Sequence, residues 1–550
     1  MSVQPDCFSI EKKPVERRFR LVVATFFLLV SAPATGLSQN APASTNAQWN
    51  AHMNSGINLL HQQKFELAKQ QFLLAIQGRK NDPKGFIYAG LADLNLGQLL
   101  EAEQAFRQAI LLDPRSAPAH YNLGLTYSRQ NKFSQAIEEL KQAVALAPQD
   151  ADGLYNLGVL LLGQHRPVEA LQYLEQAQQV GALSPELSVH LVRAYLATGR
   201  ADNAHKLARS ASSRFENSPE LQLALANAFL VHNLPSSALT YLEKASSQVP
   251  CDPSIQLPLA EANLQTGHGK QALEALECLS ARLQSNPEYH HFLARGYLVS
   301  GRKEEAIHEI LRSIQLDPKN PIYQLALGRF YQKYGEQRKA VEVLEKTAEL
   351  HPDFPEIPYS IAVSYFVAGK YEYALRYLDT AVRLDPKFDR AFFLVGITKM
   401  AQGQFEEAQS FLLRSVQLQP RNHFYHCFYG MALFAQLRII EATISFQRTV
   451  QLDPSYGVGY YHLGRALAQQ GKNLEAQKAL ERAIELRPDL PEAYYYLRTV
   501  YVRLGEKDRA MNALTAYQRL RAKQMTERQE MLKSLQEVVG ASAADDSSRQ

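Results

Sequence analysis

The sequence lacks the cysteine content of small disulfide-stapled proteins and the basic excess of nucleic-acid binders. It has four cysteines and one tryptophan in 550 residues, and so few cysteines do not build a disulfide scaffold. The 59 basic and 55 acidic residues leave a formal net charge of +4. So small an excess does not favour nucleic acid as a partner.

The common catalytic and phosphate-binding motifs are also absent. The chain contains no G-x-x-x-x-G-K-[ST], no H-E-x-x-H, no C-x-x-C and no G-x-S-x-G. His423, His426 and Cys427 share one side of an expected helix, and their side chains would suit zinc or copper. No fourth ligand accompanies them, and the surrounding aromatics favour interhelical packing. We therefore predict a protein that is not an enzyme and has no cofactor or metal.

The first 36 residues have the pattern of an export signal. Arg17, Arg18 and Arg20 precede an apolar run from Leu21 to Val30, and small residues follow it. This order is typical of a secretory signal peptide. The alternative is an uncleaved anchor, but the run is shorter than the ~20 residues that span a bilayer. We predict a signal peptide over 1–36, a flexible linker over 37–48 and an exported protein that is periplasmic, in the cell envelope or secreted.

A period of 34 residues runs from Trp49 to residue 524. The twentieth residue of every period is alanine: Ala68, Ala102, Ala136, Ala170, Ala204, Ala238, Ala272, Ala306, Ala340, Ala374, Ala408, Ala442, Ala476 and Ala510. The eighth residue is Gly or Ala in all but two periods, which have Val192 and Arg498. Each period also holds two stretches with helical apolar spacing. Small residues at positions 8 and 20 would let two helices approach closely, and a larger side chain would overpack their crossing.

The pattern resembles the tetratricopeptide repeat, as at Leu123, Gly124, Tyr127 and Ala136, with Asp113-Pro114 closing the preceding period. The resemblance implies an all-α, right-handed superhelical solenoid of fourteen helix-turn-helix repeats. We number the predicted repeats 1 to 14: 49–82, 83–116, 117–150, 151–184, 185–218, 219–252, 253–286, 287–320, 321–354, 355–388, 389–422, 423–456, 457–490 and 491–524. Residues 525–550 are expected to hold the end of a capping helix and a disordered tail.

The resemblance further implies a concave groove, lined by the first helix of each repeat, that binds peptides or proteins. Aromatic residues at position 5 and arginines at position 9 would anchor partners and pair with carboxylates. The candidate partner-binding residues are Tyr121, Asn122, Tyr155, Asn156, Arg193, Arg295, Arg329, Tyr359, Phe393, Tyr461, Arg465 and Tyr495. The other interpretation of this stripe is packing against the next repeat. Family members that bind chaperone carboxylates have a lysine at position 5, where Tyr121 and Tyr155 stand in this chain.

Repeats 5 to 8 are the least regular. Leu279 replaces an alanine that repeats 1 to 6 have at position 27, and Pro258 falls inside a first helix, which it should shorten or kink. Cys251 and Cys278 fall in adjacent elements. Export would permit a disulfide between them, unless the helix spacing holds them apart.

Two functional hypotheses follow. The first is a non-catalytic interaction scaffold in the cell envelope that binds protein or peptide partners, without nucleic acid and without membrane insertion after signal cleavage. The alternative is a regulatory or substrate-recognition subunit of a separately encoded enzyme, such as a glycosyltransferase or protease.

Overall fold

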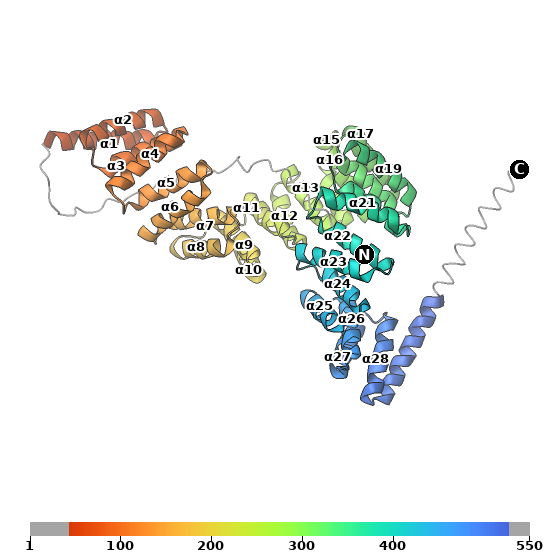
Figure 1. Ribbon diagram of the computed structural model, residues 1–550. Coiled ribbons are helices and arrows are strands. Elements are labelled where there is room, and N and C mark those ends of the chain that lie inside the picture. Colours follow the sequence, from red (N-terminus) through yellow and green to blue (C-terminus); the bar gives the residue numbers. More distant parts are fainter. Residues whose placement is uncertain (1–42, 527–550) are drawn as a thin grey trace. The chain divides into compact units, whose positions relative to one another are not determined.

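A computed structural model describes residues 43–526, which form helices joined by short turns and contain no strand. The predicted signal peptide and most of the predicted tail lie outside this range. The described chain divides into two compact units (Figure 1). The N-terminal unit holds the residues up to Ser285 together with Phe292–Ala306, and the C-terminal unit holds Asn286–His291 and the residues from Ile307 onward. Between residues 43 and 526, no helix has both the length and the apolar character needed to cross a membrane.

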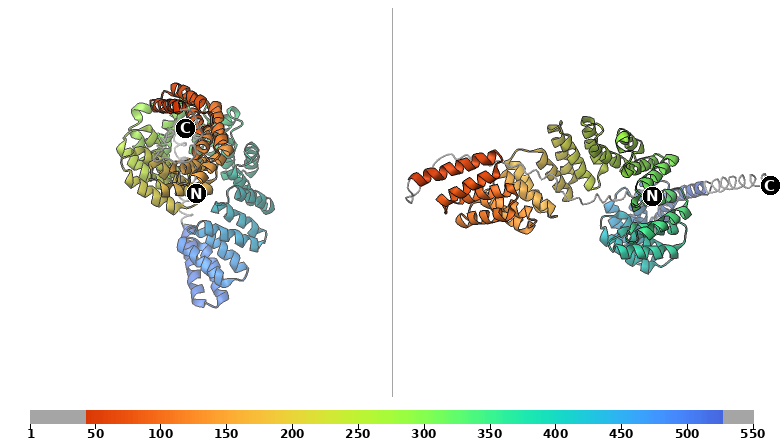
Figure 2. Two further views of the ribbon diagram at one scale, coloured as in Figure 1. Left: turned by 90° about the vertical axis from the view of Figure 1, so that its left-hand side faces the viewer. Right: turned by 90° about the horizontal axis from the view of Figure 1, so that it is seen from above.

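The N-terminal unit is a row of helical hairpins, which Figure 2 shows from two further sides in red to yellow-green. Its helices, paired within each repeat, are α1 (Ala43–His61) with α2 (Phe65–Gly78), α3 (Pro83–Leu96) with α4 (Leu99–Leu112), α5 (Ala117–Arg129) with α6 (Phe133–Leu146), α7 (Ala151–Gly163) with α8 (Pro167–Val180), α9 (Pro185–Ala197) with α10 (Ala201–Arg214), α11 (Pro219–Val231) with α12 (Pro235–Gln248), and α13 (Pro253–Gln265) with α14 (Gly269–Glu277) and α15 (Ser280–Leu283).

The C-terminal unit repeats the same hairpin. The division between the units falls within α16 (Pro287–Val299) and α17 (Lys303–Leu316). The helices that follow are α18 (Pro321–Lys333) with α19 (Gln337–Leu350), α20 (Glu356–Val367) with α21 (Tyr371–Leu384), α22 (Asp389–Ala401) with α23 (Phe405–Leu418), α24 (His423–Ala435) with α25 (Ile439–Leu452), α26 (Gly457–Gln469) with α27 (Asn473–Leu486), and α28 (Pro491–Leu504) with a helix over 507–526. The predicted all-α solenoid of hairpin repeats is confirmed.

The close approach of the two helices in a hairpin depends on the small residue at position 8. A Cβ added at Gly124 would lie 2.8 Å from Leu140 Cγ and 3.2 Å from the carbonyl oxygen of Ala136. The same contact between positions 8 and 24 recurs at Gly430, whose added Cβ would lie 2.7 Å from the Phe446 ring. Real Cβ atoms do not approach that closely, so a larger residue would push the helices apart. The predicted role of the small residues is therefore confirmed.

Every repeat turns from its first helix to its second through a residue with positive φ at position 15. This residue is glycine in nine repeats, and it is Gln63, Asn131, His165, Asn233 or Leu437 in the other five. A left-handed residue ends a helix by turning the chain back on itself, and glycine adopts that conformation without a Cβ clash. The turn therefore fixes the hairpin in all fourteen repeats.

Prolines at the start of several first helices occupy the first helical turn, as at Pro185, Pro219, Pro321 and Pro491. Proline suits this place because its missing N–H would have no partner there.

Two features differ from expectation. Helix α1 begins at Ala43, within the stretch predicted as linker. Pro258 lies inside α13 without shortening it, since α13 has 13 residues like α9 and α11. The irregularity of repeat 7 lies instead in its second helix, which is divided between α14 and α15 at Cys278 and Leu279.

Candidate partner-binding face

The twelve candidate residues all lie on first helices, and we call this surface the first-helix face. In the N-terminal unit they come from α5, α7, α9 and α16, and in the C-terminal unit from α18, α20, α22, α26 and α28. They do not form one continuous cluster. Neighbouring repeats instead join them into small local groups, which differ in how far their polar atoms are already engaged.

In repeats 3 and 4 the candidate residues bind one another and their own backbone. Asn156 Nδ2 donates to Tyr121 Oη at 2.9 Å and to the Asp152 carbonyl at 2.9 Å. Asn122 Nδ2 donates to the carbonyl of Pro118 at 2.8 Å and is almost fully buried. Burial raises the pKa of Tyr121, and the nearby Asp152 adds to the rise. These side chains join repeat 3 to repeat 4, as the packing interpretation supposes.

Repeat 5 brings a histidine, which sequence analysis did not select, against Tyr155. The His190 ring meets the Tyr155 ring edge-on, with 5.6 Å between centroids. Burial, together with the charge of Arg193, lowers the pKa of His190 to about 4. Burial likewise raises the pKa of Tyr155 to about 12. At neutral pH this group is therefore a neutral ring pair beside the exposed side chain of Arg193.

Arg295 on α16 is engaged by the preceding repeat. Its two terminal nitrogens reach the carboxylate of Glu261 on α13, at 2.5 Å and 3.0 Å. The guanidinium carbon also lies 5.7 Å from the centre of the Phe292 ring. A bidentate pair of this kind is strong and directional. Arg295 therefore contributes to the contact between repeats 7 and 8.

Repeats 9 to 12 gather two arginines among aromatic rings. The guanidinium carbon of Arg390 lies 5.5 Å from the centre of Tyr359 and 5.1 Å from that of Phe388. Burial lowers the pKa of Arg329, and the charge of Arg390 lowers it further. This part of the face therefore holds two neighbouring positive charges, of which Arg390 lies over two rings.

Phe393 continues this group toward the next repeat. Its ring centre lies 4.8 Å from that of Tyr425, whose hydroxyl donates to Asp389 Oδ2 at 2.6 Å. Phe393 also meets Phe428 edge-on, with 5.2 Å between centroids. These contacts fix the ring of Phe393, and with it the aromatic side of the group.

Repeats 12 to 14 place an arginine between two rings. The guanidinium carbon of Arg465 lies 4.2 Å from the centre of Phe434 and 5.5 Å from that of Tyr496. Burial raises the pKa of Tyr461, and the charge of the same arginine opposes this rise. Beside them Tyr495 is 45% exposed, with its ring edge-on to Tyr496 at 5.4 Å. This group combines a fixed cation with an aromatic side chain that solvent reaches.

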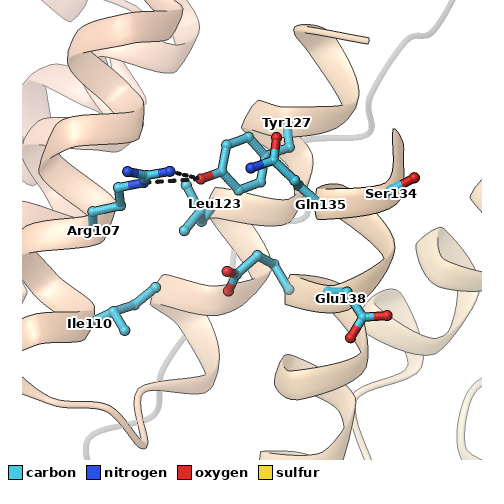
Figure 3. A pocket seen from close by; sticks show the side chains of 8 residues that line it. Arg107, Ile110, Leu123, Tyr127, Ser134, Gln135 and Glu138 are labelled. Atoms are coloured by element: carbon cyan, nitrogen blue, oxygen red, sulfur yellow. Dashed lines mark hydrogen bonds between the residues drawn. The ribbon is translucent and has the colours of Figure 1, made fainter. Parts of the chain in front are cut away.

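A pocket of about 430 Å³ opens elsewhere, between α4, α5 and α6, and sequence analysis did not predict it (Figure 3). It is lined by Arg107, Ile110, Leu123, Tyr127, Ser134, Gln135, Glu138 and Glu139. Arg107 donates from Nη2 and Nε to Tyr127 Oη, at 2.7 Å and 3.0 Å. Tyr127 Oη in turn donates to Glu103 at 3.4 Å.

The tyrosine–glutamate bond of this pocket recurs along the chain. Tyr195 donates to Glu175 at 2.9 Å, and Tyr501 donates to Glu481 at 2.8 Å. Each bond joins position 11 of one repeat to the second helix of the repeat before it. The polar atoms of the pocket therefore serve mainly to join neighbouring repeats. The recurring tyrosine at position 11 is the feature of the sequence that indicates these bonds.

The possible metal cluster of repeat 12 is divided among separate partners. His423 Nε2 lies 3.5 Å from Asp453 Oδ2, whereas His426 Nε2 lies 3.0 Å from the carbonyl of Pro420. Cys427 is buried in the core, and burial raises the pKa of its thiol. Across residues 43–526 no three His, Cys, Asp or Glu side chains are grouped so as to hold a metal ion.

Fold and face together define a helical-repeat protein of the kind that serves as an interaction scaffold. Models described as tetratricopeptide repeat match residues 121–186, 161–228 with 233–296, and 389–422. A model described as TPR repeat matches 90–131 and 464–505. These segments together span just over half of the sequence. The chain belongs to the tetratricopeptide repeat family.

Solved structures with similar folds include a chain of the APC/C hetero-tetramer Cut9–Hcn1, at 13% identity and a TM-score of 0.39, covering 83% of this chain and 97% of that one. YrrB, a TPR protein with an unusual peptide-binding site, is 22% identical, with a TM-score of 0.30 and coverages of 34% and 96%. MamA is 23% identical, with a TM-score of 0.29 and coverages of 30% and 97%. A comparison with curated proteins gave no match.

Proposed function

We propose that this protein is a non-catalytic scaffold of the cell envelope that binds peptide segments of partner proteins on the first-helix face of its C-terminal unit. The observation that carries the proposal is the group in repeats 12 to 14. There Arg465 is held between two rings, and Tyr495 lies exposed beside it.

A guanidinium fixed in this way has lost its side-chain freedom before a partner arrives. Binding then costs less ordering entropy than it would for a free arginine. Arginine and tyrosine are also the residue types most often found at interface hot spots. We infer that this group binds a segment with a carboxylate next to an apolar or aromatic side chain.

The location in the envelope rests on residues 1–36, whose charge and apolar pattern are those of an export signal. The partner is then a protein exposed to the same compartment. The alternative role, as a regulatory or substrate-recognition subunit, would use the same face to hold an enzyme.

To test the proposal, the full chain with a C-terminal tag is used to capture partners from the envelope extract and, separately, from the cytosolic extract of its own host. The partner affinity is then measured for Tyr495→Ala and for Tyr373→Ala. Tyr373 is a matched control because it is 51% exposed but lies on the second helix α21. We expect an envelope partner whose affinity falls at least about tenfold with Tyr495→Ala and stays unchanged with Tyr373→Ala.

Equal losses in both variants, or none, would exclude the first-helix face of repeat 14. A partner found only in the cytosolic extract would exclude the envelope scaffold. An envelope enzyme whose turnover changes when the chain is added would favour the regulatory subunit.

A further inference from the structure

Two cysteines far apart in the sequence meet beside the divided helix of repeat 7. Cys251 lies in the turn between α12 and α13, and Cys278 caps the C-terminus of α14, just before the break. The Cys251 side chain lies near enough to that of Cys278 to contribute to the raised pKa of the Cys278 thiol. Arg282 on α15 donates from Nη1 to the carbonyl of Cys251 at 3.4 Å. The arginine bond therefore holds the turn of repeat 6 beside the divided second helix of repeat 7, with the two cysteines at this contact.

The backbone at Cys251 is unusual among the repeats. Its φ is +59°, and it is the one residue of the described chain with positive φ outside the position-15 turns. A non-glycine residue in this region is strained, because its Cβ crowds the following carbonyl. Strain of this kind concentrates at functional sites, where the surrounding structure holds it in place. At this contact the strained residue is Cys251 itself, one of the two cysteines.

The partner thiol also lies at an exceptional point. Second helices with both ends described run 14 residues without interruption, for example α12 and α17, whereas repeat 7 has 9 residues in α14 and 4 in α15. Cys278 is exposed, while Cys251 is partly exposed. A small oxidant can therefore reach the pair. Cys427, in contrast, is buried in the core of repeat 12.

We propose that Cys251 and Cys278 are a redox modification site, and that their disulfide clamps the end of repeat 6 to the divided helix of repeat 7. The oxidant is a disulfide, either of a small thiol or of a protein. The Cys278 thiolate attacks one sulfur of that disulfide and releases one thiol, leaving a mixed disulfide on Cys278. The Cys251 thiolate then attacks the Cys278 sulfur and releases the second thiol.

The reaction balances as two protein thiols oxidised to one disulfide, and one disulfide reduced to two thiols. Because the two thiols are already neighbours, closing the bond needs only a small movement of the turn. Burial, together with the neighbouring Cys251, raises the pKa of the Cys278 thiol to about 11. At neutral pH Cys278 is thus mostly thiol, so that it reacts slowly with free disulfides.

The test uses the full reduced chain treated with oxidised glutathione, followed by peptide mapping without reductant and by hydrogen exchange. We expect one cross-linked peptide joining Cys251 to Cys278, with the loss of two hydrogens and no retained glutathione. Amide exchange over residues 269–283 should slow at least about tenfold, because the clamp opposes local opening of the divided helix. Dithiothreitol should reverse both changes.

Three serine variants sharpen the test. Cys251→Ser and Cys278→Ser should each remove the cross-link, and Cys251→Ser should retain glutathione on Cys278. Cys427→Ser is the matched control and should still form the cross-link. Glutathione adducts on both cysteines of the wild-type chain, a cross-link between two chains, or unchanged exchange despite the cross-link would each overturn the proposal.

Discussion

Repeats 3 and 7 belong to the same compact unit and have first helices of equal length, yet only one has an intact second helix. In repeat 3, α6 runs unbroken for 14 residues, whereas repeat 7 is divided into α14 and α15. The contact inside the hairpin is kept in both. Gly124 meets Leu140 in repeat 3, and the corresponding Ala260 and Leu276 of repeat 7 are fully buried.

The difference lies at position 27, on the side of the second helix that faces the next repeat. In repeat 12 this position is Thr449, whose methyl group would lie 2.9 Å from a Cβ added at Gly459 of repeat 13. Repeat 3 has Ala143 there, and repeat 7 has the buried Leu279, where the helix breaks. The helix thus breaks where a large side chain occupies a place built for a small one. The hairpins of repeats 3 and 7 therefore share the contact between their own two helices, and they differ in the side chain that faces the next repeat.

The largest expected effect is the difference in stability cost between alanine substitutions of two buried leucines, one in repeat 3 and one in repeat 7. Leu140→Ala removes a core side chain from an intact hairpin and should lower the local free energy of opening by ~2–5 kcal/mol. Leu279→Ala should cost clearly less, because alanine is the residue that repeats 1 to 6 have at that position and it would let α14 and α15 join.

Hydrogen exchange of peptides from repeats 3 and 7 measures both effects. A local readout is needed because long repeat arrays need not unfold in one step. An equal cost at the two positions would mean that Leu279 does not cause the break.

A second, smaller effect concerns the close approach inside repeat 3. Gly124→Ala places a Cβ 2.8 Å from Leu140 Cγ, and overpacking of this kind should destabilise the repeat by ~1–3 kcal/mol. Gly163→Ala is the control, since Gly163 ends helix α7 with no atom within 4 Å of an added Cβ. That change should be neutral or stabilise by up to ~1 kcal/mol. Hydrogen exchange of peptides from repeats 3 and 4 compares the two variants locally, and a harmless Gly124→Ala would remove the close-approach argument.

The sequence predicts the hairpins well because their constraints recur with the period. Position 20 is always alanine, and position 8 is small wherever the structure shows the closest contact, as at Gly124 and Gly430. The turn at position 15 carries an equally regular signal, since the residue there is glycine in nine of the fourteen repeats. The start of α1 at Ala43 carried no such signal, because it lies before the first period.

The candidate face is less predictable, because spacing along the chain does not fix distances between side chains of different repeats. Tyr121 was selected as a partner contact, yet its hydroxyl accepts a hydrogen bond from Asn156 of the next repeat. Arg295 similarly pairs with Glu261 of the preceding repeat. Such bonds depend on how far one hairpin is rotated against the next, which no single repeat encodes. Tyr495 could be selected by position, but its exposure came only from the structure.

The smallest expected effect tests the feature that repeats 3 and 7 share, the left-handed turn at position 15. The residue is Asn131 with φ +60° in repeat 3 and Gly267 with φ +82° in repeat 7. Gly267→Ala should cost about 1 kcal/mol, because alanine in this region carries a steric penalty that glycine lacks. Asn131→Gly should change stability by less, since asparagine tolerates the conformation through its short polar side chain. Hydrogen exchange of the two turns compares them directly, and a Gly267→Ala chain as stable as the parent would mean that repeat 7 can form its hairpin without the turn found in the other repeats.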